Sequence, residues 1–467
     1  MVFSNLFFIY VFLPLNIILY FCARTNRTRN MIMVAFSLVF YAWGEPVWVL
    51  LLLLTALLNW GLGLVVGARR GQRSARVALT AAVAVDLCLL GLFKYSGFLY
   101  ENINALLGTS FQAPGFTLPI GISFYTFQII SYMADVYRGD VEAQPSYLKF
   151  LMYVTMYHQL VAGPIVRYQW IAEEIDNRTV DLEDIWGGFC RFCVGLTKKV
   201  LVANVAGELS ARFLDGDLSK VSAMGALLGM VLFALQIYYD FSAYSDMAIG
   251  MGRIFGFHYN ENFLYPYTAT SVTDFWRRWH ISLSTFFRDY VYIPLGGKYN
   301  HQMRNICIVW LLTGLWHGAS WNFVLWGAYY GVLLILEKLF LLRALERLPK
   351  AVGVLWSWAA VFFGWSLFYY TDLGRLGGFL TALFGGGAGF ADPGVGVLLL
   401  NNVLWFCLAI LFCAPLLPAL KARTEALPAQ RRYRVVIVQA GLCVLMLIVS
   451  TALLVGQSYN PFLYFRF

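Results

Sequence analysis

The strongest constraint in this sequence is its succession of apolar runs of about twenty residues, separated by short polar stretches. A helix of that length crosses the hydrocarbon core of a bilayer, where charged side chains are costly. The chain has 467 residues, of which 60% are hydrophobic and only 13% are charged. The sequence therefore predicts an all-α, polytopic membrane protein with about ten to twelve transmembrane helices plus re-entrant or interfacial helices, forming one domain over residues 1–467.

Short basic clusters between the apolar runs carry the net charge of +9, a distribution that suits a membrane surface better than a nucleic-acid groove. Two clusters, at residues 24–29 and 67–76, are separated by enough apolar sequence for two spans, with "WGEP" (43–46) as the turn. Both clusters can then face the cytoplasm, which puts the N-terminus and, by continued counting, the C-terminus outside. Residues 2–20 are expected to be a retained span rather than a signal peptide.

Residues 146–300 have shorter apolar runs, many aromatic side chains and interior charges. Such a pattern predicts broken or re-entrant helices, which membranes tolerate where they line a cavity or are buried in protein. We therefore expect the functional core within residues 118–342.

One stretch, "LTGLWHGASWNF" (312–323), places a histidine deep in a span. At about 1.5 Å per helical residue, the distance from Arg304 puts His317 roughly 20 Å into the membrane. A neutral buried imidazole is a competent general base, and small neighbours would leave room beside it. Alternatively, His317 bonds a neighbouring helix and the glycines serve close helix packing. On a helix, its face would be shared by Thr313, Gly314, Ser320 and Trp321.

The second polar constellation is "TDFWRRWHISLSTFFRDYVYIPLGG" (273–297). One interpretation is an amphipathic interfacial helix with arginines at the lipid headgroups. The other is a cytoplasmic anion site for a phosphate-bearing donor, with His280 beneath it. On a helix, Asp274 can pair with Arg278 at i,i+4. The flanks of His280 would be Trp276, Arg277 and Ser284, and the anion site would use Arg277, Arg278, Arg288 and Lys298.

Other motifs give little support to metal or nucleotide chemistry. Cys190 and Cys193 form a CxxC pair, but no second pair completes a zinc site, so packing is the favoured interpretation. The glycines of "GMGRIFG" (250–256) have the wrong spacing for a dinucleotide-binding loop.

Taken together, "FWRRWHISLSTFFRDYVYIPLGG" and "GLWHGASWNFVLWG" resemble the membrane-bound O-acyltransferase family, and within it the membrane subunits of bacterial alginate O-acetyltransferases. Further similar stretches are "PIGISFYTFQIISYMADVYRG" (119–139), "AGPIVRY" (162–168), "YYDFSAYSDMAIGMGRIFGF" (238–257) and the terminal "NPFLYFRF" (460–467). The resemblance runs nearly end to end.

The resemblance implies a helical bundle around a tunnel in the bacterial inner membrane, with His317 and His280 as its catalytic histidines. His317 would deprotonate an acceptor hydroxyl that attacks a cytoplasmic acyl thioester, and His280, oriented by Ser284, would position a reactant or stabilise the oxyanion. Acetyl-CoA is the expected donor substrate, with no bound cofactor; the acceptor is a secreted polysaccharide or a periplasmic relay partner. The expected substrate-binding residues are Trp316, Trp321, Ser284, Asp274, Trp276, Arg277, Arg278 and Arg288.

Three alternatives remain at this point. The related D-alanine-loading enzymes of teichoic acid synthesis share both histidines, so D-alanyl transfer is a second reaction. A transporter or flippase would use a proton or ion relay of His317, Asp240, Asp246 and Arg253. A noncatalytic scaffold would retain its function without His317.

Overall fold

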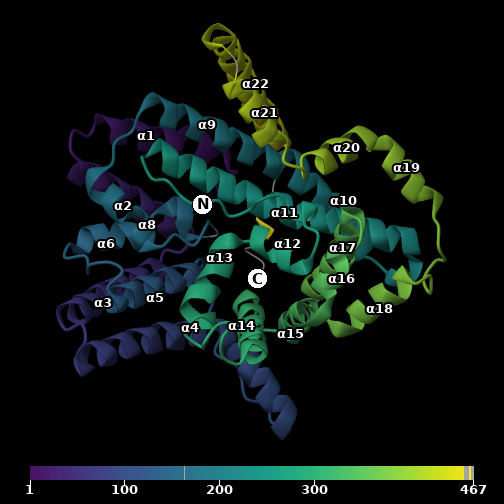
Figure 1. The fold of residues 1–467 in the computed structure, drawn as a ribbon, viewed down its shortest axis with the longest axis horizontal. Coiled ribbons are helices and arrows are strands. Elements are labelled where there is room, and N and C mark those ends of the chain that lie inside the picture. Colours follow the sequence, from purple (N-terminus) through teal and green to yellow (C-terminus); the bar gives the residue numbers. More distant parts are fainter. Residues whose placement is uncertain (162, 427, 457–461, 464–467) are drawn as a thin grey trace.

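The computed structural model describes residues 1–161, 163–426, 428–456 and 462–463. Over these residues the secondary structure is helical, with no strand (Figure 1). The all-α prediction is confirmed. Most of the predicted external end, residues 458–467, and the first residue of "AGPIVRY" lie outside the described residues.

Helices occupy the first predicted spans, although within the described residues the first helix long and apolar enough to cross a membrane is Trp48–Ala68. The "WGEP" turn separates the second helix from the third, as expected, and the fourth helix is the longest of the first five. Thr25 begins the second helix by accepting a hydrogen bond from the Thr28 amide at 3.2 Å. The helices are α1 Leu13–Cys22, α2 Asn26–Gly44, α3 Trp48–Ala68, α4 Arg73–Leu107 and α5 Ile122–Arg138.

Six described helices are long and apolar enough to cross a membrane: Trp48–Ala68, Arg73–Leu107, Ala223–Ile254, Trp321–Glu346, Lys350–Tyr369 and Arg434–Val455. A seventh candidate consists of α19 (Pro393–Asn401) and α20 (Val403–Leu411) with a bend of 71° between them. The chain is thus a multi-pass membrane protein, and the full number of ten to twelve spans stays a prediction.

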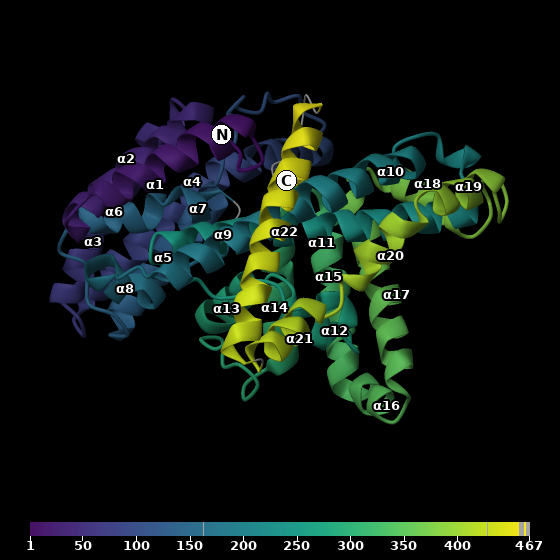
Figure 2. The same cartoon turned by 90° about the horizontal axis from the view of Figure 1, so that it is seen from above.

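The middle of the chain is broken into short helices, as predicted, with one exception. The exception is α11 (Ala223–Ile254), an uninterrupted helix of 32 residues that is buried over most of its length against α9 and α10 (Figures 1 and 2). The short helices are α6 Tyr147–Thr155, α7 Tyr157–Leu160, α8 Tyr168–Asn177, α9 Leu182–Thr197, α10 Asn204–Leu214, α12 Val272–Arg278 and α13 Ile281–Phe287.

The interior charges of α11 are matched by opposite charges from neighbouring elements. Asp240 pairs at 2.5 Å with Lys199, which lies in the π-helical segment Lys198–Ala203 between α9 and α10. Asp246 pairs with Lys198 at 2.6 Å, and it also pairs with an arginine of α9. Because burying a charge is tolerated when it is paired and hydrogen-bonded, these contacts explain how a central helix carries carboxylates.

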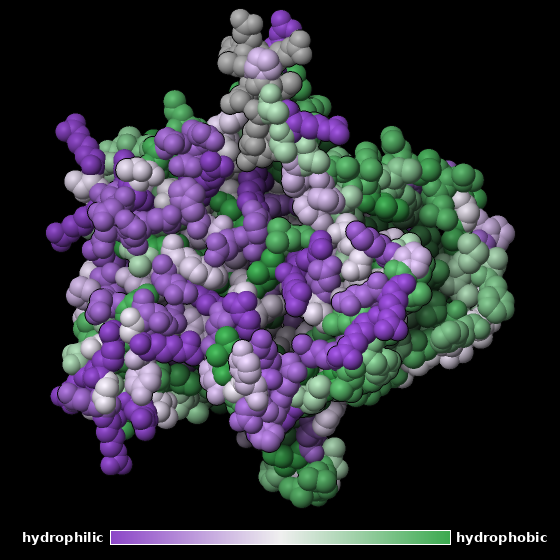
Figure 3. Space-filling model, in the orientation of Figure 1, coloured by the Kyte–Doolittle hydropathy of each residue, from purple (hydrophilic) through white to green (hydrophobic). Residues whose placement is uncertain are grey.

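The surface divides into polar and apolar regions (Figure 3). Hydrophilic residues gather on much of the face in view, whereas hydrophobic residues cover the edge formed by α18 (Leu373–Leu383), α19 and α20. On α19 and α20, Leu400 is 75% exposed and Leu404 is 71% exposed. Large exposed apolar side chains in such numbers suit contact with lipid.

Candidate active site

His317 is the last residue of α14 (Gln302–His317), a helix of 16 residues. At 1.5 Å per residue the helix is about 24 Å long, and the depth of the histidine in the membrane stays a prediction. After Gly318, α15 (Trp321–Leu336) begins and runs back beside α14. His317 therefore lies at the inner end of a helical hairpin, and its side chain is buried.

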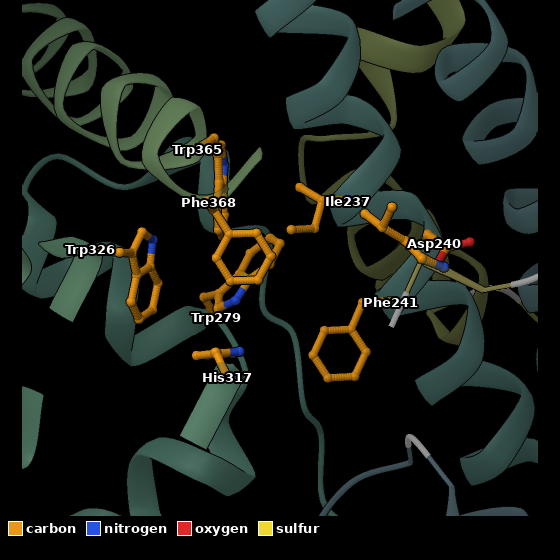
Figure 4. A pocket seen from close by; sticks show the side chains of 9 residues that line it. Ile237, Asp240, Phe241, Trp279, His317, Trp326, Trp365 and Phe368 are labelled. Carbon is orange, nitrogen blue, oxygen red and sulfur yellow. The ribbon is translucent and has the colours of Figure 1, made fainter. Parts of the chain in front are cut away.

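The imidazole lines a small cavity of about 20 Å³ (Figure 4). Residues of α11 form one side, and residues of α15 and α17 (Lys350–Tyr369) form the other. That volume holds about one water molecule, so an acyl group can enter only if side chains move. The lining residues are Ile237, Asp240, Phe241, Trp279, His317, Trp326, Trp365, Phe368 and Leu463.

His280 lies at a break between two helices, not within one as predicted. Its φ of 45° is in the left-handed region, which ends α12 and lets α13 start in a new direction. The prediction that Ser284 orients the imidazole is wrong: that hydroxyl donates to the Trp276 carbonyl at 3.3 Å. Neither ring nitrogen of His280 has a hydrogen-bond partner within the described part of the chain.

Trp316 brings the two histidines together. Its ring lies 5.0 Å from that of His317 and 5.9 Å from that of His280, measured between centroids. The His280 ring also packs on Phe241 of α11 at 4.6 Å. Two buried imidazoles therefore contact one indole, and of these three residues His317 lines the aromatic cavity.

A buried carboxylate that sequence reasoning missed fixes the helix leading to His280. Glu337 follows α15, and it accepts hydrogen bonds from the Val272 amide at 2.7 Å and the Thr273 amide at 2.8 Å. It also accepts from the Thr273 hydroxyl and from the Trp356 indole. An anion at the first turn of α12 satisfies amides that have no partner within the helix. The signal in the sequence was a lone glutamate inside the run "VLLILEKLF" (332–340).

The glycines around His317 do not leave space beside its ring. A Cβ on Gly314 would lie 2.3 Å from the Phe323 carbonyl oxygen, and one on Gly318 would lie 2.2 Å from the Phe323 ring. On the facing helix, a Cβ on Gly327 would lie 2.4 Å from a carbonyl oxygen of α14. The glycines thus allow α14 and α15 to touch through their backbones, as the packing alternative stated.

Gly314→Ala is expected to destabilise the protein by about 1–3 kcal/mol, because the added methyl forces the two helices apart. The measurement is the melting temperature in detergent. The control is Gly331→Ala, one turn after Gly327 on α15. Its added Cβ would lie 3.4 Å from the Cβ of Trp310, which is an ordinary van der Waals contact. Equal melting temperatures for the two variants would contradict the close packing.

Two predicted substrate-binding tryptophans lie away from the cavity. Trp276 packs between Trp310 and Tyr330, each with ring centroids at 4.8 Å, and so supports the wall of the cavity from behind. Trp321 is 54% exposed and donates to Asn102 of α4 at 2.9 Å. Neither lines the cavity that contains His317.

The predicted arginines are not equally available to an anion. Arg278 is held by Asp274 at 2.9 Å, as predicted, while Arg277 is exposed. Arg288 pairs with Asp289 at 2.6 Å and keeps an exposed side chain. Partial burial raises the pKa of the Asp289 carboxyl, but Arg288 and Arg167 outweigh it and hold that pKa below its ordinary value. Of Arg277, Arg278 and Arg288, the exposed Arg277 and Arg288 are therefore better placed to bind an anion from solution.

Fold and site together define a polytopic membrane protein built around two buried histidines. The chain belongs to the membrane-bound O-acyltransferase family, whose model matches residues 140–372, and is therefore an acyltransferase by family. It is 36% identical to a probable alginate O-acetylase of Azotobacter vinelandii over the full length of both chains. It is 40% identical to the protein of that name from Pseudomonas aeruginosa, over 80% of this chain and 73% of that one.

A third relative has a different polymer in its name. The chain is 32% identical to a peptidoglycan O-acetyltransferase of Helicobacter pylori, over 73% of this chain and 71% of that protein. These similarities confirm the family resemblance found in the sequence motifs. They do not assign roles to individual side chains, which are argued from the geometry of the site.

Proposed function

We propose that this protein transfers an acetyl group from a cytoplasmic thioester to a hydroxyl of a secreted polysaccharide or of a periplasmic relay protein. The observation that carries the proposal is the placement of His317 at the buried end of α14, on an aromatic cavity and beside His280. Similar proteins named for alginate and peptidoglycan acetylation support a polysaccharide acceptor.

In this mechanism His317 is the general base. Its imidazole takes the proton of the acceptor hydroxyl as the oxygen attacks the acetyl carbonyl. The tetrahedral intermediate then collapses, the thiolate leaves, and the proton passes from the imidazolium to the departing sulfur. No protein nucleophile is required, because a thiolate is a good leaving group.

His280 is proposed to bind a reactant or stabilise the oxyanion, without being oriented by Ser284. Both of its ring nitrogens are buried without a partner in the described chain, and a buried polar group without a partner is costly. An acetyl carbonyl or the oxyanion formed from it would satisfy such a donor. The left-handed backbone at this residue is a strained feature of the kind that gathers at functional sites.

Acetyl-CoA is the proposed donor, with Arg277 and Arg288 as contacts for its phosphates. Guanidinium groups bind phosphate by charge-assisted hydrogen bonds, and both side chains are exposed. We propose that this face lies on the cytoplasmic side of a bacterial inner membrane, and the distribution of the basic loops supports that orientation. D-alanyl transfer from a carrier protein is the alternative reaction for the same pair of histidines.

The test uses the purified protein in lipid vesicles with acetyl-labelled CoA outside and a polysaccharide acceptor, with and without candidate periplasmic partners. We expect label to appear on the acceptor at the expense of the thioester. If the protein transfers no label from acetyl-CoA but transfers labelled D-alanine from a carrier protein, the D-alanyl alternative would replace the acetyl proposal. Movement of an intact substrate without thioester cleavage would favour transport.

A further inference from the structure

Two adjacent residues of α4 contact the end of the helix that carries His317. Tyr95 donates its hydroxyl to the Leu315 carbonyl at 2.5 Å. Lys94 donates its ammonium to the Trp316 carbonyl and lies 3.4 Å from the His317 carbonyl oxygen. These contacts join positions more than two hundred residues apart in sequence, and sequence reasoning assigned neither residue a role.

The three carbonyls are those that the helix itself leaves without partners. The last hydrogen bond of α14 runs from the Gly318 amide to the Gly314 carbonyl, so the carbonyls after Gly314 have no amide within the helix. In a membrane no bulk water replaces the missing donors, and an unsatisfied carbonyl there costs several kcal/mol. Lys94 and Tyr95 supply them.

In its protonated form, Lys94 adds a charge to the effect of the hydrogen bonds. A cation at the C-terminus of a helix interacts favourably with the helix dipole. The ammonium also lies 5.8 Å from the centre of the Trp316 ring, within the range of a cation–π contact. Trp316 in turn contacts both histidines, so one side chain of α4 holds the backbone of His317 and the indole beside it.

We propose that Lys94 and Tyr95 are positioning residues that hold His317 and Trp316 in the geometry needed for acyl transfer. The proposal rests on the proposed role of His317 as general base. A lysine inside a membrane span is costly, and such residues are usually retained for function. Here Lys94 donates to the carbonyls of Trp316 and His317, and it also donates to the Ser123 hydroxyl of α5 at 3.5 Å.

The expected result is a loss of turnover without a loss of donor binding. Lys94→Met keeps the length and apolar stem of the side chain but removes the donor and the charge. Its kcat should fall about 10- to 100-fold, because a displacement of about 1 Å in a catalytic group costs that much. The KM for the thioester should stay within about twofold. Lys94→Arg, which retains donors and charge, should recover part of the rate, and Tyr95→Phe should cause a smaller loss than Lys94→Met.

The control is Asn102→Ala, which removes the hydrogen bond between the same helix and Trp321 but leaves the end of α14 untouched. Its kcat should match the wild type. All rates are normalised to folded protein measured by size-exclusion chromatography. A wild-type kcat for Lys94→Met would overturn the proposal, as would a loss that the Arg variant does not relieve or a loss shared by Asn102→Ala.

Hydrogen–deuterium exchange of residues 310–320 gives a readout that does not depend on activity. Exchange should rise in Lys94→Met and stay at the wild-type level in Asn102→Ala. If no variant and no wild type transfers acetyl, the proposed reaction fails while the exchange data still decide whether the two residues hold the helix end. Unchanged exchange in Lys94→Met would overturn the proposal irrespective of the reaction.

Discussion

Replacing His317 with asparagine is expected to lower acetyl transfer by about 10²- to 10⁴-fold, the range for loss of a general base. Asparagine keeps a polar side chain of smaller volume against Trp326 and Phe368, whose rings lie 4.9 and 5.3 Å from the imidazole. The fold should therefore survive. The measurement is polymer-linked acetyl per unit of folded protein in the membrane.

His258→Asn is the matched control for this loss. That histidine is a solvent-accessible partner of Glu174, at 2.8 Å, and it does not line the cavity. We expect transfer close to the wild-type rate. Should His317→Asn also transfer acetyl at that rate, His317 would not be the base, and the scaffold alternative would regain support.

The sequence alone predicted those spans whose formation depends on a single segment of the chain. The requirement for about twenty apolar residues predicts α3, α17 and the last helix, α22 (Ala429–Val455), without knowledge of their neighbours. The pairing of Asp274 with Arg278 was readable for the same reason, since i,i+4 neighbours meet on any helix.

The break at His280 could not be read in the same way. The stretch "FWRRWHISL" (275–283) contains no glycine or proline, and yet the histidine adopts a left-handed backbone conformation. What stabilises the turn comes from elsewhere in the chain: Glu337 holds the start of α12, and the Ile281 amide donates to the Asn262 carbonyl at 3.0 Å. Tertiary contacts of this kind override the local preference for a continuous helix.

The roles of Gly314 and Lys94 also could not be predicted from sequence, because they depend on contacts with residues elsewhere in the chain. Gly314 fits either a space beside an imidazole or a close helix contact, and only the position of Phe323 decides between them. Lys94 stood in an apolar run that otherwise predicts a plain span. A lone cation in such a run was a signal, but its role became clear only from its contact with the carbonyls of α14.

Asp240→Asn is expected to cost about 3–5 kcal/mol of stability, because it removes the carboxylate charge from a buried ion pair with Lys199. Both side chains are at most 5% exposed, and their atoms lie 2.5 Å apart. The other carboxylate oxygen accepts the backbone amide of Leu463 at 2.6 Å. The measurement is the melting temperature in detergent, with Glu208→Gln as the control, since that exposed pair with Arg212 contributes little. An unchanged melting temperature in Asp240→Asn would contradict this account of the pair.

A double replacement separates the stability of this ion pair from its place on the cavity. Asp240→Leu combined with Lys199→Met removes both charges together, and exchanging a buried pair for apolar side chains is often neutral. The melting temperature should therefore recover most of the loss seen in the single variant. Because Asp240 also lines the cavity of His317, acetyl transfer by the double variant distinguishes two roles. If both the melting temperature and acetyl transfer recover, the role of the Asp240 carboxylate is limited to its ion pair with Lys199. If the protein is stable but inactive, the carboxylate also contributes to acetyl transfer at the cavity.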